Sequence, residues 1–140
     1  MDWVSCKKGD LAKEIKIDKN LIIALIKSSS KKLHTQDLFE LNDDTASSKI
    51  SLVYEGVREL LEALAISKGY KIYNHECYCA FLKEILFESR LGSKFNDFRK
   101  LRNAINYYGK DLSMKEAKIV LDDMLIFIGK IKDLLKSYAS

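Results

Sequence analysis

The chain has 140 residues, of which 47% are hydrophobic and 31% charged, with six glycines, no proline and a formal net charge of +4. This composition fits a single globular domain over residues 1–140 and excludes a disordered or collagen-like chain. The longest apolar run, residues 21–26, is far shorter than the roughly 18 residues that suggest a membrane span. Because the first residues also lack the features of an export signal, we expect a cytoplasmic protein that does not enter a membrane.

Apolar residues recur at spacings of three and four from Asp18 to the end of the chain, and this periodicity predicts an all-α fold. Residues 1–17 are polar and poorly patterned. The predicted helices, about five in number, span approximately residues 18–41, 42–68, 74–87, 94–108 and 113–136.

Local signals define the ends of these helices. Side-chain N-caps are expected at residues 42–44, Asn74 and Ser113, and left-handed C-terminal caps at Gly69 and Gly109. Ser113 and Glu116 have the spacing of a capping box, in which each side chain bonds the backbone N–H of the other residue. Gly92 and Ser93 are expected to separate the third helix from the fourth.

The last helix carries the clearest packing signal. Its apolar residues, spaced alternately by four and three, are Ala117, Leu121, Met124, Ile128, Ile131, Leu135 and Tyr138. This spacing predicts an up-and-down antiparallel bundle, because it lets a helix lie along a near-parallel neighbour. A second stripe at Val120, Phe127 and Leu134 has two interpretations, the contact of a homodimer or a wide face inside one bundle.

The three cysteines predict neither a disulfide framework nor a metal site. Cys6, Cys77 and Cys79 are an odd and sparse set, so we expect buried free thiols. Cys77 and Cys79 are separated by about 200° on a helix, so they cannot face one ion together with His75. Phosphate-loop, dinucleotide-binding and zinc-hydrolase motifs are absent from the sequence, and no cofactor is expected.

The positive charge concentrates in the fourth predicted helix and the start of the fifth. Residues 90–118 contain eight basic and three acidic residues, which indicates either a polyanion partner or a solvated basic face. A helical projection places Arg99, Arg102, Asn103 and Asn106 within a stripe about 100° wide, opposite the apolar residues of this helix.

Two interpretations of this polar stripe are open. As an anion site, it would use the guanidinium groups for phosphate oxygens and the amides for sugar hydroxyls or bases. As a salt-bridged face, it would be neutralised by the acids of the second helix, Glu55, Glu59 or Glu62.

The residues of this stripe also carry a resemblance. The run RKLRNAINYYG at residues 99–109, preceded by YEGVRELLEAL at 54–64 and GYKIYNHE at 69–76, resembles the HEPN (higher eukaryotes and prokaryotes nucleotide-binding) family. The likeness covers residues 49–136, and its most specific piece is Arg-Asn-x-x-Asn-Tyr-Tyr-Gly. It implies a small, usually dimeric helical bundle. Many members are metal-independent endoribonucleases of toxin–antitoxin, CRISPR-linked or RNA-processing systems, and others are partners of minimal nucleotidyltransferases.

The sequence departs from the active pattern of that family, which is an arginine followed after four to six residues by a histidine. Arg99 or Arg102 matches the arginine, but Asn106 or Tyr107 stands where the histidine would be. Asparagine cannot exchange a proton, and a tyrosine of pKa ~10 would have to be strongly shifted to do so. The two histidines, His34 and His75, are expected to be structural or exposed.

The leading hypothesis is therefore a HEPN-like homodimer that binds RNA or a nucleotide through Arg99, Arg102, Asn103 and Asn106 and has degenerate catalysis. One alternative is an active endoribonuclease that yields a 2′,3′-cyclic phosphate, with Arg102 and Tyr107 as its catalytic residues. A second alternative is a non-catalytic partner of a minimal nucleotidyltransferase.

Overall fold

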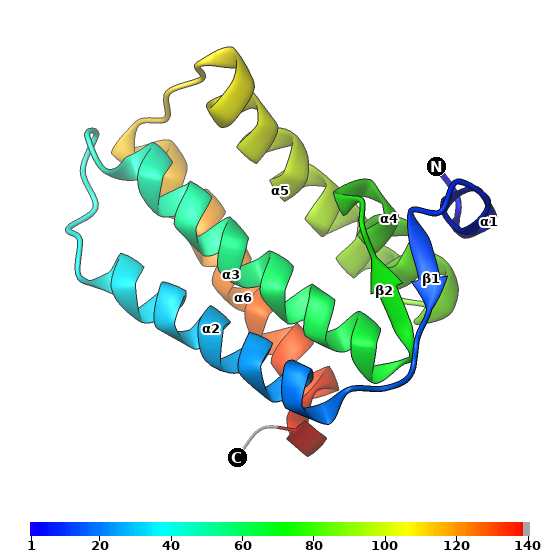
Figure 1. Cartoon of the computed structure of the whole chain (residues 1–140). Coiled ribbons are helices and arrows are strands. Elements are labelled where there is room, and N and C mark those ends of the chain that lie inside the picture. The colour runs from blue at the N-terminus through cyan, green and yellow to red at the C-terminus, as the bar shows by residue number, and fades with distance from the viewer. Residues whose placement is uncertain (139–140) are drawn as a thin grey trace.

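The computed structural model describes residues 1–138 and has the predicted all-α architecture, a bundle of helices with one very small sheet (Figure 1). The long helices are α2 (Lys19–Asp37), α3 (Ala46–Ser67), α5 (Ser89–Tyr108) and α6 (Met114–Leu134). The short elements are α1 (Trp3–Lys8), β1 (Ala12–Glu14), β2 (Tyr70–Ile72), α4 (His75–Ala80), a π-helical segment (Phe81–Ile85) and a 3₁₀ turn (Lys136–Tyr138). Within residues 1–138, no helix combines the length and the apolar character that crossing a membrane requires.

Helix α3 is the centre of the bundle. Figure 1 shows it between α2 and α5, and it also packs against α6. Seven apolar residues along one side of it are fully or almost fully buried: Ile50, Val53, Tyr54, Val57, Leu60, Leu61 and Leu64. Because α3 contacts three other long helices, it carries far more buried residues than a helix with one apolar face.

The apolar pattern of α6 is also confirmed. The residues of its first stripe from Ala117 to Leu135 are all buried. Phe127 of the second stripe packs inside the same chain, with ring centroids 5.5 Å from Phe98 and 6.3 Å from Phe95. Since Leu134 is exposed, the second stripe does not form one continuous face, and the interior of the bundle accounts for Phe127. The homodimer stays a prediction.

Most of the predicted helix ends are confirmed. Asn74 accepts a hydrogen bond from the backbone N–H of Glu76, and Ser113 and Glu116 form both halves of the capping box. Gly109 ends α5 with φ of 66°. The predicted N-cap at residues 42–44 is wrong: α3 begins at Ala46, and the Asn42 side chain instead accepts from the backbone of the next loop residues.

The predicted helix break at Gly92 and Ser93 is wrong as well, because α5 already begins at Ser89. A Cβ atom at position 92 would lie 2.6 Å from Cγ of Lys83 and 3.1 Å from the carbonyl oxygen of Cys79. The glycine therefore lets α5 approach α4 and the π-helical segment closely. The third predicted helix, 74–87, is divided correspondingly into α4 and this segment.

The unpatterned N-terminal segment contains two elements that the sequence did not predict. After α1, strand β1 pairs antiparallel with β2, so that Ala12 lies opposite Ile72 and Glu14 opposite Tyr70. Strands of three residues are too short for the alternation of apolar and polar residues by which strands are predicted. This sheet fixes the chain immediately before α4 (Figure 1).

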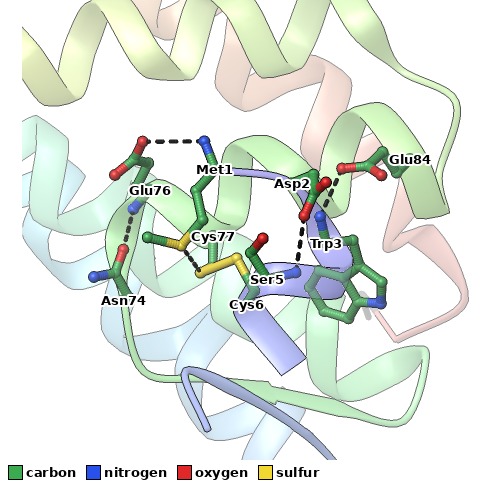
Figure 2. The surroundings of a disulfide bond; sticks show 9 residues. All are labelled: Met1, Asp2, Trp3, Ser5, Cys6, Asn74, Glu76, Cys77 and Glu84. Atoms are coloured by element: carbon green, nitrogen blue, oxygen red, sulfur yellow. Dashed lines mark hydrogen bonds and ion pairs between the residues drawn. A yellow bond between two sulfur atoms is a disulfide. The ribbon is translucent and has the colours of Figure 1, made fainter. Parts of the chain in front are cut away.

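The expectation of three free thiols is wrong for two of the cysteines. Cys6 in α1 and Cys77 in α4 form a disulfide (Figure 2). Cys79 is free and buried. An odd number of cysteines is compatible with one bond and one free thiol. Because the two partners are 71 residues apart in sequence, only the docking of α1 on α4 reveals the pair.

Reduction of the Cys6–Cys77 bond is expected to lower the free energy of unfolding by about 2–4 kcal/mol. The physical reason is that the bond closes a long loop and thereby restricts the unfolded chain. Urea unfolding with and without reductant measures the difference.

A Cys6→Ala, Cys77→Ala variant provides the control, since its unfolding midpoint should not respond to reductant. Equal stability of the oxidised and reduced wild-type chain would contradict the assigned disulfide.

Candidate functional site

The polar stripe of α5 borders a hollow of ≈ 370 Å³. One wall is formed by α5 and the other by the residues that lead from β2 into α4. The hollow is lined by Tyr73, Asn74, His75, Glu76, Arg99, Arg102, Asn103 and Tyr107. Four of the residues predicted from the sequence, Arg99, Arg102, Asn103 and Tyr107, therefore lie together.

Asn106 does not join them. It lies beside α3 in a neighbouring hollow that also contains Ser51 and Glu55. The Ser51 hydroxyl donates a hydrogen bond to Asn106 Oδ1 at 3.4 Å. The predicted stripe is thus divided between two hollows, because α3 lies against the turn of α5 that carries Asn106.

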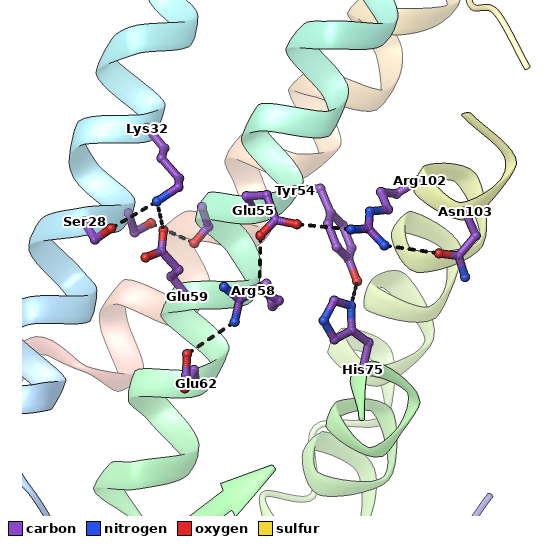
Figure 3. Close-up of polar contacts among 12 residues, drawn as sticks. Ser28, Lys32, Tyr54, Glu55, Arg58, Glu59, Glu62, His75, Arg102 and Asn103 are labelled. Atoms are coloured by element: carbon purple, nitrogen blue, oxygen red, sulfur yellow. Dashed lines mark hydrogen bonds and ion pairs between the residues drawn. The ribbon is translucent and has the colours of Figure 1, made fainter. Parts of the chain in front are cut away.

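Arg102 lies at the junction of α3 and α5 (Figure 3). Its Cζ atom is 5.4 Å from the ring centroid of Tyr54 and 5.9 Å from that of Tyr107, both within the range of a cation–π contact. Its Nη2 atom lies 3.4 Å from Oε1 of Glu55, whereas strong charged hydrogen bonds are about 2.7–2.9 Å long. The guanidinium is therefore positioned by two rings and only weakly paired with an acid.

The acids of α3 otherwise pair elsewhere. Glu59 forms an ion pair with Lys32 at 2.8 Å, and Glu62 pairs with Arg58 and Lys71. Of these three acids, only Glu55 contacts an arginine of the site, Arg102, through Oε1. The other carboxylate oxygen of Glu55 accepts from Arg58 at 3.2 Å.

Arg99 has a neutral partner. Its Nε and Nη2 atoms donate to Oδ1 of Asn96 at 3.3 and 2.7 Å. Within the described residues, no carboxylate lies at ion-pair distance from Arg99, so its positive charge is not compensated by a direct contact. The hollow thus contains one uncompensated guanidinium and one weakly compensated one.

The hollow also contains residues that the sequence did not indicate as part of a site, and His75 is the one among them with an imidazole ring. It opens α4, and its Nδ1 atom lies 2.9 Å from the hydroxyl oxygen of Tyr54. Tyr54 is fully buried, and burial raises its pKa, so the hydroxyl keeps its proton. No other partner of this hydroxyl is found within residues 1–138. A buried donor requires an acceptor, so we infer that Tyr54 donates to Nδ1 and that the ring proton of His75 is on Nε2.

The charge state of His75 follows from its surroundings. Burial lowers its pKa below the ordinary 6.5, and the positive charges of Arg58 and Arg102 lower it further, while Glu55 acts in the opposite direction. His75 is therefore neutral at pH 7, and in the inferred tautomer its Nε2–H group is available as a hydrogen-bond donor. No cluster of three metal-binding side chains is found in the described part of the chain.

His75 escaped prediction for a topological reason. The family pattern places the histidine on the same helix as the arginine, but this ring comes from a separate helix earlier in the chain. Asn74 predicts a helix start at residue 75, yet no spacing rule links that start to Arg102. Only the packing of α4 against α5 brings the two side chains to one hollow.

Comparisons of the chain with protein-family models, with curated proteins and with solved structures find no match. The resemblance to HEPN proteins therefore stays a prediction. Any functional assignment rests on the geometry of the hollow and on the chemistry of its side chains.

The lowered pKa of His75 predicts a pH effect on stability. Well above pH 6.5 the ring is neutral in both the folded and the unfolded chain, so it has no effect on stability. Below pH 6.5 the unfolded chain takes up the proton more readily than the folded chain, so the free energy of unfolding should decrease. Urea unfolding at several pH values should show a smaller acid loss in a His75→Gln variant, and NMR titration of the ring should give a midpoint below 6.5. A midpoint at or above 6.5 would contradict this account of the ring.

Proposed function

We propose that this chain binds RNA or a nucleotide by its phosphate in the hollow between α4 and α5, without cleaving it. The observation that supports the proposal most is the pair of guanidinium groups, Arg99 and Arg102, on one wall of this hollow. The planar fork of donors on a guanidinium matches the oxygens of a phosphate and can bind them in pairs.

Both arginines can accept a new anionic partner. Arg99 bonds a neutral amide, so a phosphate would be its first ionic partner among the described residues. Arg102 would exchange a 3.4 Å contact with a partly exposed Glu55, and ion pairs of this kind contribute little. Binding of a phosphate therefore requires neither group to give up a strong bond.

The hollow also supplies neutral donors. With Tyr54 bonded to Nδ1, the Nε2–H group of His75 is left to donate to a phosphate oxygen or a sugar hydroxyl. Asn103 accepts from Arg102 through Oδ1, at 3.5 Å, so its amide nitrogen keeps both protons for a ligand. These donors suit an anion that also carries sugar or base groups.

A second candidate function is a metal-independent endoribonuclease, because a histidine, His75, lies in the hollow and histidine can transfer protons. Cleavage would need a group that accepts the proton of the 2′-hydroxyl. The tautomer inferred for His75 has Nε2 already protonated and Nδ1 occupied by Tyr54. Because the exposed Tyr107 has no hydrogen-bond partner within residues 1–138 to activate it, the arrangement supports binding better than cleavage.

The wider setting of the proposal comes from the resemblance alone. It includes a homodimer, a toxin–antitoxin or RNA-processing system and the alternative of a minimal nucleotidyltransferase as partner. A nucleotidyltransferase reading frame beside this gene would support that alternative. The proposal also places the protein in the cytoplasm, where a structural disulfide such as Cys6–Cys77 would be an exception.

The proposal predicts that an Arg99→Gln, Arg102→Gln variant binds a labelled single-stranded RNA about a hundredfold or more weakly at low salt, because it loses two charged hydrogen bonds that each contribute about 1.5 kcal/mol or more. The slope of log affinity against log salt should fall by about 1.4, which corresponds to two phosphate contacts. Fluorescence anisotropy measures both quantities.

An Arg90→Gln, Lys100→Gln variant is the matched control, since it removes the same charge from exposed positions of α5 outside the hollow. It should retain most of the affinity, whereas Glu55→Gln should increase it by releasing Arg102. Equal losses in the two double variants would show that binding depends on net charge alone and would contradict the proposed site. If the protein cleaves the RNA and a chelator does not stop the cleavage, the endoribonuclease hypothesis would replace the proposal of binding without cleavage.

A further inference from the structure

Two exposed tyrosines belong to the hollow, one on each wall. Tyr73 is 58% exposed and lies between β2 and α4, while Tyr107 is 68% exposed and lies in the last turn of α5. Both line the same hollow as the two arginines. Large aromatic side chains usually bury most of their surface, so two exposed rings around one cationic hollow form a feature that the phosphate site alone does not explain.

The backbone holds both tyrosines in place. The N–H of Tyr73 donates to the carbonyl oxygen of Leu11 at 2.7 Å, next to the β1–β2 pair, and Asn74 then caps α4. Tyr107 is part of α5, and the guanidinium of Arg102 lies 5.9 Å from its ring centroid. The backbone of both tyrosines is therefore held next to the cationic groups, while most of the surface of each ring remains exposed to a ligand.

We infer that Tyr73 and Tyr107 stack on unpaired bases of a single-stranded RNA whose phosphate lies on Arg99 and Arg102. This inference rests on the proposed function, since the arginines must bind the backbone of the same strand. Stacking on aromatic side chains is available to any base, but only when the base is outside a duplex. The rings consequently select single strands over double strands and have little preference for sequence.

The other polar groups of the hollow agree with an RNA ligand of this kind. Asn103 and His75 each keep a neutral donor for a sugar hydroxyl or a base edge. Glu76 lines the hollow too, and its carboxylate lies 3.6 Å from the N-terminal amine of Met1. The Glu76 carboxylate would repel a phosphate on that side of the hollow, and the positive charge of the amine compensates it.

The test compares three fluorescent ligands by anisotropy: a single-stranded RNA oligomer, an abasic strand with the same number of phosphates, and the duplex of the oligomer. The single strand should bind about tenfold more tightly than the abasic strand, in line with the loss that follows removal of a stacking contact. A Tyr73→Leu, Tyr107→Leu variant should lose this difference, and the Tyr73→Phe, Tyr107→Phe variant should keep it. Both positions are exposed, so both variants should fold, which circular dichroism verifies.

The possible outcomes separate the inference from the function on which it rests. If the abasic strand binds as tightly as the oligomer and both lose affinity with Arg99→Gln, Arg102→Gln, then stacking is overturned and the phosphate site stands. If the duplex binds as tightly as the single strand, then stacking is overturned as well. If none of the three ligands binds, both the phosphate site and the stacking fail.

Discussion

The candidate site depends on one buried side chain, Tyr54 of α3. Its ring stacks on Phe95 of α5 at a centroid distance of 5.6 Å, and its hydroxyl bonds His75 at the start of α4. The face of the same ring carries the guanidinium of Arg102. A single residue therefore connects the three helices that contribute to the site and sets the positions of its cationic and neutral donors. The burial that raises the pKa of Tyr54 also keeps its hydroxyl protonated, which determines the tautomer of His75.

The charges around Tyr54 are only partly balanced, and this determines what the hollow can bind. Glu55 lies between Arg58 and Arg102, so one carboxylate is shared by two guanidinium groups (Figure 3). Such sharing orients Arg102 in the free protein but leaves its donors incompletely used. Arg99, whose guanidinium bonds Asn96 and no carboxylate among residues 1–138, adds a second cation in the same hollow. If both guanidinium groups were fully paired with carboxylates, they would only stabilise the fold. The observed pairing leaves positive charge in the hollow for an anionic ligand.

The sequence predicts those features that are periodic or local. Spacings of three and four placed the buried stripes of α3 and α6, and cap residues such as Asn74 and Ser113 placed helix ends. The projection of α5 brought Arg99, Arg102 and Asn103 to one wall. The remaining features are contacts between distant segments. The Cys6–Cys77 bond, the role of Gly92 in close packing and the position of His75 all depend on which helices dock together, and no single-helix rule contains that information.

The most direct test of the site is to observe its guanidinium groups. The chain has four arginines, so their Nε–H resonances can be assigned individually by NMR. During titration with a single-stranded RNA oligomer, we expect the resonances of Arg99 and Arg102 to shift together with that of the His75 ring, while the resonance of Arg90 stays unchanged. Shifts at Arg90 or at the N-terminal lysines, with Arg99 and Arg102 unaffected, would contradict a phosphate site in the hollow between α4 and α5.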